Sequence, residues 1–263
     1  MLYQGISNVG RAATGFIEEV GYAFAIFVES IYWIFVGPSV GQPVRMQLIV
    51  AEMMNVAVRA VPILALLAMT NGAMLAIQGI YTLKDFDAEP QVVPAIALSI
   101  TREFAVLIVG IVVAGRSGSA IAARIGSMQM SQEIDALRVM GVNPIRYLVA
   151  PILVAMLVMF PMLTIFADFV GMAGGGVLVS LALHIPLETY ATRCFDALEV
   201  FDIVQGLLKS VVFAVLITLV GAVNGFSVEG GAEGLGKGTT RSVVLCISSI
   251  VVADMIFTFF LSR

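Results

Sequence analysis

The sequence is dominated by long apolar runs that few charges interrupt. These runs cover residues 60–83, 91–115, 147–183, 204–226 and 242–261, and the first contains no charged residue. Of the 263 residues, 60% are hydrophobic and 12% are charged, against about 25% charged in an average soluble domain. A bilayer core of about 30 Å needs roughly 20 apolar residues in a helix. The runs therefore predict an all-α integral membrane protein.

The run 147–183 is the one whose number of crossings is ambiguous. As one helix it would be about 55 Å long, nearly twice the bilayer core, and we expect a break at Gly171 and at residues 174–176. One interpretation is a single span that ends near Gly171, with an irregular outer segment after it, and the other is two spans. The conformation of residues 172–203 stays open between a re-entrant segment, a helix and a loop.

Charge in the flanking loops favours the single span. Four arginines precede the run: Arg116, Arg124, Arg138 and Arg146. The loop after the run carries four acidic residues and one arginine: Glu188, Asp196, Glu199, Asp202 and Arg193. Arginine-rich loops tend to stay in the cytoplasm, so an odd number of crossings should separate the two loops. The predicted spans are about 60–83, 91–115, 147–171, 204–226 and 242–261, with a cytoplasmic N-terminus.

Residues 1–46 form a separate N-terminal region, and residues 47–263 form the transmembrane domain. In the stretch 16–36, Glu18, Glu19 and Glu29 share an arc of about 100° with Tyr22 and Trp33, while the opposite face is apolar. This pattern is typical of a helix that lies in the membrane interface. A tilted span is the alternative.

Two short motifs indicate enzymes but lack the context that the chemistry needs. Residues 230–240 read GGAEGLGKGTT, which matches the phosphate-binding pattern G-x-x-x-x-G-K-[ST] except that Gly238 replaces the hydroxyl residue. The stretch follows a predicted span rather than a strand, and we expect it to be a flexible glycine-rich turn. Residues 115–118 resemble the GxSG motif of rhomboid proteases, but the single histidine, His184, is predicted on the opposite membrane side from Ser117.

No catalytic residue and no metal site are therefore assigned. The two cysteines, Cys194 and Cys246, are far apart in sequence, and we expect both to be packing residues. The formal net charge of -4 offers no basic surface for nucleic acid.

The loop between the second and third spans contains a predicted short helix at about 131–141. Acidic residues open it, apolar residues follow at helical spacing, and a glycine precedes Asn143-Pro144. Its candidate docking residues are Glu133, Ile134, Asp135, Leu137, Arg138, Met140 and Gly141. A short helix held below the membrane can transmit the movement of a soluble partner to the spans. A plain amphipathic surface helix is the alternative.

Four strings, in this order, make the chain recognisable. They are SITREFAVLIVGIVVAGRSGSAIAARIG, SQEIDALRVMGVNP, GLLKSVVFAV and GGAEGLGKGTTRSVV. They resemble the MlaE family, also called YrbE, which are permease subunits of ABC transporters associated with MCE lipid carriers. The resemblance covers most of the chain from about Gln47 onward. It implies a homodimeric permease with five spans per subunit and an N-terminal interfacial helix.

The same resemblance implies the partners and the roles of individual residues. ATP and Mg²⁺ would be held by a separate ATPase, and an MCE ring would lie on the outer side. Residues 133–140 would be the coupling helix that docks into the ATPase, with Arg116, Arg124 and Arg241 at the cytoplasmic joint. Two positions depart from the family pattern: Arg124 stands where an acidic residue is common, and Ile152 stands where arginine is common.

Two adjacent charges, Arg102 and Glu103, lie near the middle of the second span, where each ionised residue costs roughly 2.5 to 3.5 kcal/mol. Neighbours in a helix point about 100° apart, so we expect them to reach different partners. The candidate partners are Arg59, Asp168, Lys209 and Asp254. Either these charges form an internal network that fixes the packing, or they make a polar spot for a lipid head group in an outward-opening cavity. The resemblance places such a pair near the lipid site.

Apolar residues near these charges are candidates to line a pocket for acyl chains. They are Leu67, Leu75, Ile77, Val106 and Leu107. The resulting hypothesis is the membrane subunit of an ATP-driven transporter in a bacterial inner membrane. It would move phospholipid or a similar lipid to or from a periplasmic MCE carrier. An ion-coupled secondary transporter and a non-transporting scaffold for an MCE protein are the alternatives.

Overall fold

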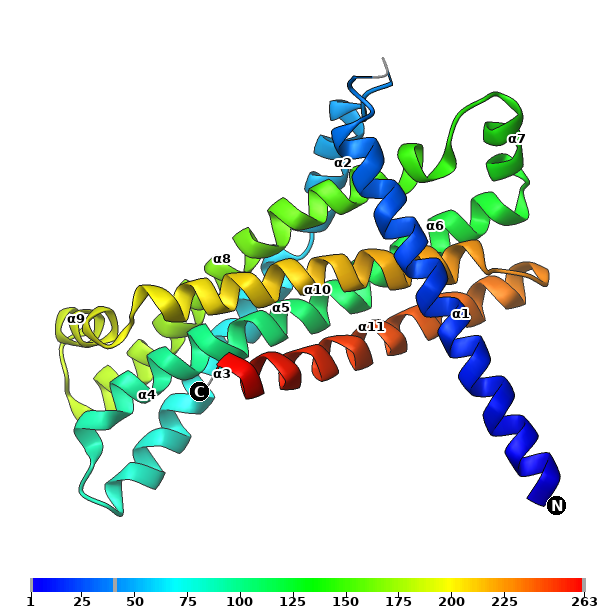
Figure 1. Cartoon of the computed structure of the whole chain (residues 1–263). Coiled ribbons are helices and arrows are strands. Elements are labelled where there is room, and N and C mark those ends of the chain that lie inside the picture. The colour runs from blue at the N-terminus through cyan, green and yellow to red at the C-terminus, as the bar shows by residue number, and fades with distance from the viewer. Residues whose placement is uncertain (1, 40–41, 262–263) are drawn as a thin grey trace. The chain divides into compact units, whose positions relative to one another are not determined.

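The computed structural model describes the backbone of residues 2–39 and 42–261, and their side chains except those of residues 2–13 and 16 (Figure 1). Within this part every regular element is helical. The α-helices are α1 (Leu2–Phe35), α2 (Met46–Ala57), α3 (Val61–Lys84), α4 (Val92–Ser99), α5 (Ala105–Val113), α6 (Ser119–Met130), α7 (Glu133–Val139), α8 (Ala150–Leu183), α9 (Leu187–Ala197), α10 (Val200–Phe226) and α11 (Gly231–Leu261). Short helices of other types are η1 (Glu89–Gln91), η2 (Ile100–Phe104), η3 (Ala114–Gly118) and η4 (Ile145–Val149).

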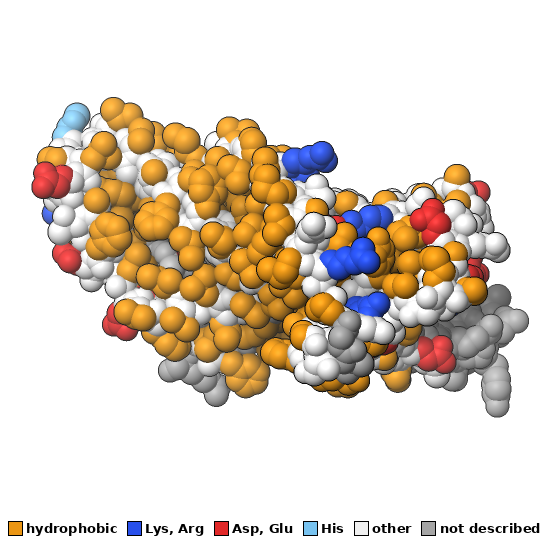
Figure 2. Space-filling view, turned by 90° about the horizontal axis from the view of Figure 1, so that it is seen from above, with side chains coloured by type: hydrophobic (Ala, Val, Ile, Leu, Met, Phe, Trp, Pro, Cys, Tyr) orange, Lys and Arg blue, Asp and Glu red, His pale blue; other side chains and the backbone are white. Residues whose placement is uncertain are grey.

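Five helical stretches in the described part are long and apolar enough to cross a membrane. They are Val61–Lys84, Glu89–Met130, Ile145–Leu183, Val200–Phe226 and Gly231–Leu261. Figure 2 shows one face of the molecule, over which hydrophobic side chains form a broad area with few charges. The prediction of an all-helical protein with five spans and an N-terminal helix is confirmed.

The expected break in the third span is wrong, because α8 continues unbroken through the glycines to Leu183. These glycines let two backbones touch. A Cβ atom added at Gly72 of α3 would lie 1.9 Å from the carbonyl oxygen of Gly171, and one added at Gly174 would lie 2.2 Å from that of Met69. Small residues at such a crossing allow close helix packing inside a membrane. The glycines are therefore a packing surface rather than a hinge.

The expected flexible turn at residues 230–240 is also wrong, because α11 begins at Gly231. The turn is shorter and lies before the helix, where Gly230 has a φ of 83°. Helix formation is supported by an ion pair between Lys237 and Glu233, 2.7 Å apart at the favourable spacing of four residues. Gly234 is required by close packing, since its added Cβ would lie 1.7 Å from the carbonyl oxygen of Glu229. Five of the eleven residues at 230–240 are glycines, a composition that is typical of a turn, although four of them lie within α11.

The chain divides into two compact units. Unit 1 contains Met1–Glu52, Ser117–Val154 and Ile217–Cys246, and unit 2 contains Met53–Arg116, Ala155–Leu216 and Ile247–Arg263. In unit 1 the fully buried apolar side chains include Ile26, Ile125 and Ile134. In unit 2 the rings of Phe160 and Phe213 pack edge to face with centroids 6.4 Å apart. Helix α7 belongs to unit 1, and the mid-span charges belong to unit 2.

Helix α9 lies between the third and fourth spans and packs through two buried side chains, Tyr190 and Cys194. The Tyr190 hydroxyl donates a hydrogen bond to the carbonyl oxygen of Met172, 3.0 Å away. Burial raises the pKa of the Tyr190 hydroxyl and of the Cys194 thiol. Both cysteines are buried and unbridged, as expected for packing residues.

Candidate functional site

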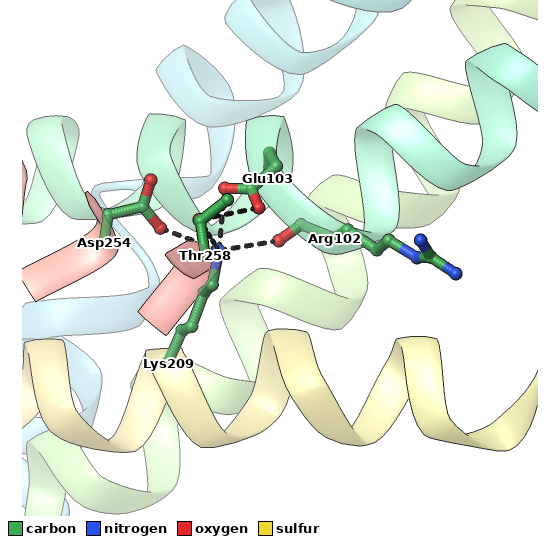
Figure 3. Close-up of polar contacts among 5 residues, drawn as sticks. All are labelled: Arg102, Glu103, Lys209, Asp254 and Thr258. Atoms are coloured by element: carbon green, nitrogen blue, oxygen red, sulfur yellow. Dashed lines mark hydrogen bonds and ion pairs between the residues drawn. The ribbon is translucent and has the colours of Figure 1, made fainter. Parts of the chain in front are cut away.

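A charged cluster lies in unit 2 where η2, α10 and α11 meet. Figure 3 shows Lys209 of α10 reaching toward Glu103 of η2 and toward Asp254 and Thr258 of α11. The Lys209 side chain is completely buried, although it is charged. A buried ammonium group is tolerated only when it is paired and hydrogen-bonded, and each of these elements supplies a partner.

Four oxygen atoms surround the Lys209 ammonium group. Its Nζ atom lies 2.7 Å from Glu103 Oε2, 2.9 Å from Asp254 Oδ1, 3.1 Å from Thr258 Oγ1 and 3.2 Å from the backbone oxygen of Arg102. Thr258 also donates to Glu103 Oε1 at 2.9 Å, so the three side chains close a ring of hydrogen bonds. An ammonium group has three protons. Lys209 therefore has no donor left for a ligand.

The cluster contains one more negative charge than positive. Lys209 is opposed by two carboxylates, Glu103 and Asp254. The Glu103 side chain is 28% exposed and that of Asp254 is 12% exposed, whereas Lys209 is fully enclosed. Glu103 is therefore the acidic group of the cluster that a ligand reaches most easily.

Arg102 forms a second, separate ion pair. Its Nε atom lies 2.6 Å from Oδ1 of Asp202, whose side chain is almost fully buried. The other oxygen of Asp202 accepts a hydrogen bond from the Glu199 backbone N–H at 2.9 Å, so the carboxylate also stabilises the start of α10. Figure 3 shows the Arg102 guanidinium group pointing away from the other four labelled residues. Its side chain is 44% exposed and remains the accessible cation of the site.

The local backbone explains why one carbonyl group is available to Lys209. Residues Ile100–Phe104 form a single π-helical turn between α4 and α5. Such wide turns interrupt the regular α-helical hydrogen bonds and are frequent at functional positions. On the facing helix, Gly206 allows close approach, because a Cβ atom there would lie 2.7 Å from the Thr101 carbonyl oxygen.

The expectation that Arg102 and Glu103 reach different partners is confirmed. Of the expected partners, Lys209 and Asp254 join the cluster, whereas Arg59 and Asp168 make none of its contacts.

Two members of the site, Asp202 and Thr258, were not predicted from the sequence. Asp202 was counted as an outer-loop acid, although its place in the first turn of α10, three residues after Glu199, is a signal for a helix cap. Thr258 carries no charge and had no sequence signal.

A groove of about 310 Å³ opens between α3 and α5 in unit 2. Its lining is mostly apolar and consists of Leu67, Thr70, Asn71, Met74, Ile108, Ile111 and Val112. Of the expected pocket residues, only Leu67 lines it, and Val106 is instead fully buried in the core. A groove of this chemistry suits hydrocarbon better than a polar solute.

The predicted docking helix is present as α7 in unit 1, although it begins at Glu133 rather than at Ser131. Gln132 adopts a left-handed conformation with φ of 59°, and this ends the preceding helix. Ile134 is completely buried, whereas Val139 is 89% exposed and Met140 is 68% exposed. The helix is therefore anchored by one face and offers an apolar tip.

Each residue assigned to the joint has its own partner. In unit 1, Arg124 pairs with Glu52, and Arg241 lies 2.6 Å from Glu19. In unit 2, Arg116 Nη2 donates to the Asn55 carbonyl oxygen at 3.4 Å. Glu52 on α2 supplies the negative charge that accommodates arginine at position 124.

These features define a multi-span membrane protein with a polar site among its spans, and comparison with known proteins identifies the family. The model of the permease MlaE family matches residues 49–260. A probable ABC transporter permease protein of Rickettsia typhi is 31% identical over 262 residues, which cover 98% of this chain and 99% of that protein. The chain therefore belongs to the MlaE permease family and is an ABC transporter permease.

Two further relatives carry more specific names. The intermembrane phospholipid transport system permease protein MlaE of Haemophilus influenzae is 29% identical, with 98% of this chain and 97% of that protein covered. The chloroplastic protein TRIGALACTOSYLDIACYLGLYCEROL 1 of Arabidopsis thaliana is 39% identical over 165 residues, or 63% of this chain and 47% of that protein.

Proposed function

We propose that this chain is the permease subunit of an ATP-driven transporter that moves phospholipid, or a similar lipid, between a bacterial inner membrane and a periplasmic MCE lipid carrier. Transport of this kind contributes to the lipid balance of the outer membrane. The observation that carries the proposal is the similarity, over nearly the full length, to an intermembrane phospholipid transport permease. The polar site among apolar spans and the apolar groove are consistent with an amphiphilic substrate.

In this proposal the energy comes from partner chains. The permease is a homodimer, and each copy docks a separate ATPase that holds ATP and Mg²⁺. The apolar tip of α7, with Val139 and Met140 exposed, is the part of the chain that contacts the ATPase. The N-terminus and α7 lie on the cytoplasmic side, and Arg124 and Arg241 support that region.

Within the site the two partly exposed charged residues, Arg102 and Glu103, have different tasks from the buried Lys209. Arg102 presents its guanidinium group to a lipid phosphate, because Asp202 occupies only its Nε edge. Glu103 limits how far an anionic group can enter. Lys209 is saturated and holds the helices together. Arg59 makes no contact with this cluster, and we assign it no part in head-group binding.

The test is lipid transfer in vesicles that contain the permease together with its ATPase and its MCE partner. A fluorescent phospholipid should move between the vesicle and the carrier when ATP is added. It should not move when a non-hydrolysable ATP analogue is added. Transfer that needs an ion gradient and no ATPase would establish the ion-coupled alternative instead. Binding of the MCE protein with no transfer would establish the scaffold.

The role of Arg102 is tested in the same vesicles with Arg102→Gln. Glutamine keeps an amide donor for the buried Asp202, which also keeps its hydrogen bond from the Glu199 N–H, so the complex should still assemble. Transfer should fall about tenfold or more, as expected for the loss of a charged hydrogen bond of about 1.5–3 kcal/mol. Arg102→Lys is the matched control and should retain part of the transfer. Loss of assembly in Arg102→Gln would show that the Arg102 and Asp202 pair only fixes the packing.

A further inference from the structure

Helix α1 packs one face against the rest of unit 1. Ile26 and Ser30 on this face are completely buried. The opposite face carries exposed apolar residues, including Phe24 at 66% and Phe35 at 73% exposure. Of the acidic and aromatic arc, Glu19, Glu29 and Trp33 contact other elements of unit 1, and their partners show what the helix holds.

The central contact joins Glu29 of α1 to Asn143, which lies between α7 and η4. Asn143 Nδ2 donates to Glu29 Oε1 at 2.6 Å. The Oδ1 atom of the same Asn143 accepts hydrogen bonds from the backbone N–H groups of Ile145 at 2.8 Å and Arg146 at 3.1 Å. One amide side chain thus caps the start of the third span and ties it to α1.

Neighbouring contacts reinforce this joint. The Arg146 guanidinium group lies 5.2 Å from the centroid of the Trp33 ring, within the range of a cation–π interaction, and it also donates to Gln42 Oε1. One turn before Ile26 and two turns before Glu29, burial raises the pKa of the Tyr22 hydroxyl, and Arg138 of α7 opposes this shift. Helix α1 therefore contacts the start of the third span from two neighbouring turns, through Glu29 and Trp33.

The same helix holds α11 ten residues earlier. Glu19 Oε1 lies 2.6 Å from Arg241 Nη2, and Figure 1 shows α1 passing beside the first half of α11. At 1.5 Å per residue, Glu19 and Glu29 are about 15 Å apart along one continuous helix. Both Glu19 and Arg241 are about half exposed, and such pairs contribute at most about 1 kcal/mol. The less exposed Glu29 contact is the more informative one to break.

We propose that Glu29 and Asn143 are positioning residues that transmit the movement of α7 to α1 and, through Glu19 and Arg241, to α11. Asn143 follows the end of α7 at Val139 by only four residues, so a displacement of α7 pulls on it directly. A continuous helix passes such a displacement along its length. The inference rests on the proposed function, in which the ATPase docks on α7.

The variant Asn143→Asp isolates this link. A carboxylate keeps an acceptor for the two backbone N–H groups of the cap, but it has no donor for Glu29 and repels it. In the vesicle assay described above, lipid transferred per ATP hydrolysed should fall by about fivefold or more, the lower end of typical coupling energies. The amount of assembled complex and its ATP hydrolysis should remain close to the wild type.

A second substitution gives the rescue. Glu29→Gln alone keeps an acceptor oxygen for Asn143 and should behave almost as the wild type. Combined with Asn143→Asp, it supplies an amide donor to the new carboxylate, which restores the hydrogen bond in the opposite direction. The double variant should therefore recover most of the transfer per ATP.

The outcomes separate the two proposals. A wild-type complex without ATP-driven transfer overturns the proposed function and this inference with it. If the wild-type complex transfers lipid normally and Asn143→Asp transfers as much lipid per ATP hydrolysed, the inference is overturned but the proposed function is not. A parallel loss of assembly and transfer that the double variant does not restore assigns Asn143 a purely structural role and also overturns it.

Discussion

At the scale of single residues, Lys209 is the side chain on which the charged cluster depends. Replacement by methionine keeps much of the volume but leaves the buried Asp254 and the partly exposed Glu103 without a counter-charge. Removal of one partner from a buried ion pair costs about 3–5 kcal/mol. Lys209→Met should therefore lower the free energy of unfolding by this amount, seen as a large fall in melting temperature in detergent.

Lys237→Met is the matched control for that experiment. Lys237 also pairs with a glutamate, Glu233, but both side chains are more than 75% exposed. A helical pair of this kind contributes about 0.3–0.5 kcal/mol. Equal melting shifts in the two variants would show that the buried cluster adds nothing beyond a surface ion pair.

Cys194 provides a residue-scale test of the packing of α9. Burial raises the pKa of its thiol, so less thiolate is present at neutral pH than in an ordinary cysteine, and the fraction increases only as the pH rises. Maleimide labelling at pH 7.5 should be about tenfold or more slower at Cys194 than at a cysteine introduced by Phe195→Cys. Phe195 is 65% exposed on the same helix. Equally fast labelling at both positions would contradict the packing.

At this scale the sequence predicted which charges need compensation but not their full set of partners. Lys209 and Asp254 were predictable because charges inside apolar runs must pair with one another. Asp202 was not, because charge counting assigned it to a loop, whereas the fold buries it beneath Arg102. Thr258 contributes only a hydroxyl group, and nothing in its sequence context separates it from other helix positions.

At the scale of helices, the crossing of α3 and α8 depends on an absent side chain. Gly72→Ala should push the helices apart, since its Cβ would meet the backbone of Gly171, which cannot move aside as a side chain does. Overpacking costs about 1–3 kcal/mol or more, which should appear as a lower melting temperature and a lower yield of folded protein.

Gly79→Ala, in the same helix, is the control. The nearest atom to an added Cβ there is a side-chain carbon of Val92 at 3.6 Å, an ordinary contact. Alanine also favours helix over glycine by about 1 kcal/mol. Gly79→Ala should be as stable as the wild type or more stable. A fall in melting temperature equal to that of Gly72→Ala would show that the close contact of α3 with α8 is not at Gly72.

The same glycines explain where element prediction failed. Helix number and type followed from apolar length and were predictable. Glycine, however, has two opposite meanings, because it can release the backbone or allow another backbone to approach. Only the position of the approaching backbone decides between them, which is helix α3 for Gly171 and the preceding turn for Gly234, and one sequence does not contain that information.

At the scale of the whole molecule, α8 should carry the chain once across the membrane. Cysteines introduced by Val139→Cys in α7 and Phe195→Cys in α9 are both exposed in the structure, whereas the two native cysteines are buried. A membrane-impermeant maleimide should label the α9 position from the outside of intact spheroplasts and the α7 position only in inverted vesicles. Labelling of both from one side would require an even number of crossings.

The charged cluster also has a consequence for how the protein is made. Lys209 can meet Glu103 once the fourth span is synthesised, but its other two side-chain partners, Asp254 and Thr258, lie in the last turns of α11. Until those turns leave the ribosome, Lys209 has only two of its four oxygen partners, Glu103 and the Arg102 carbonyl group. Full pairing of Lys209 thus depends on synthesis of the last turns of α11, and a product truncated before Asp254 would expose an incomplete site to the proteases that remove unfinished membrane proteins.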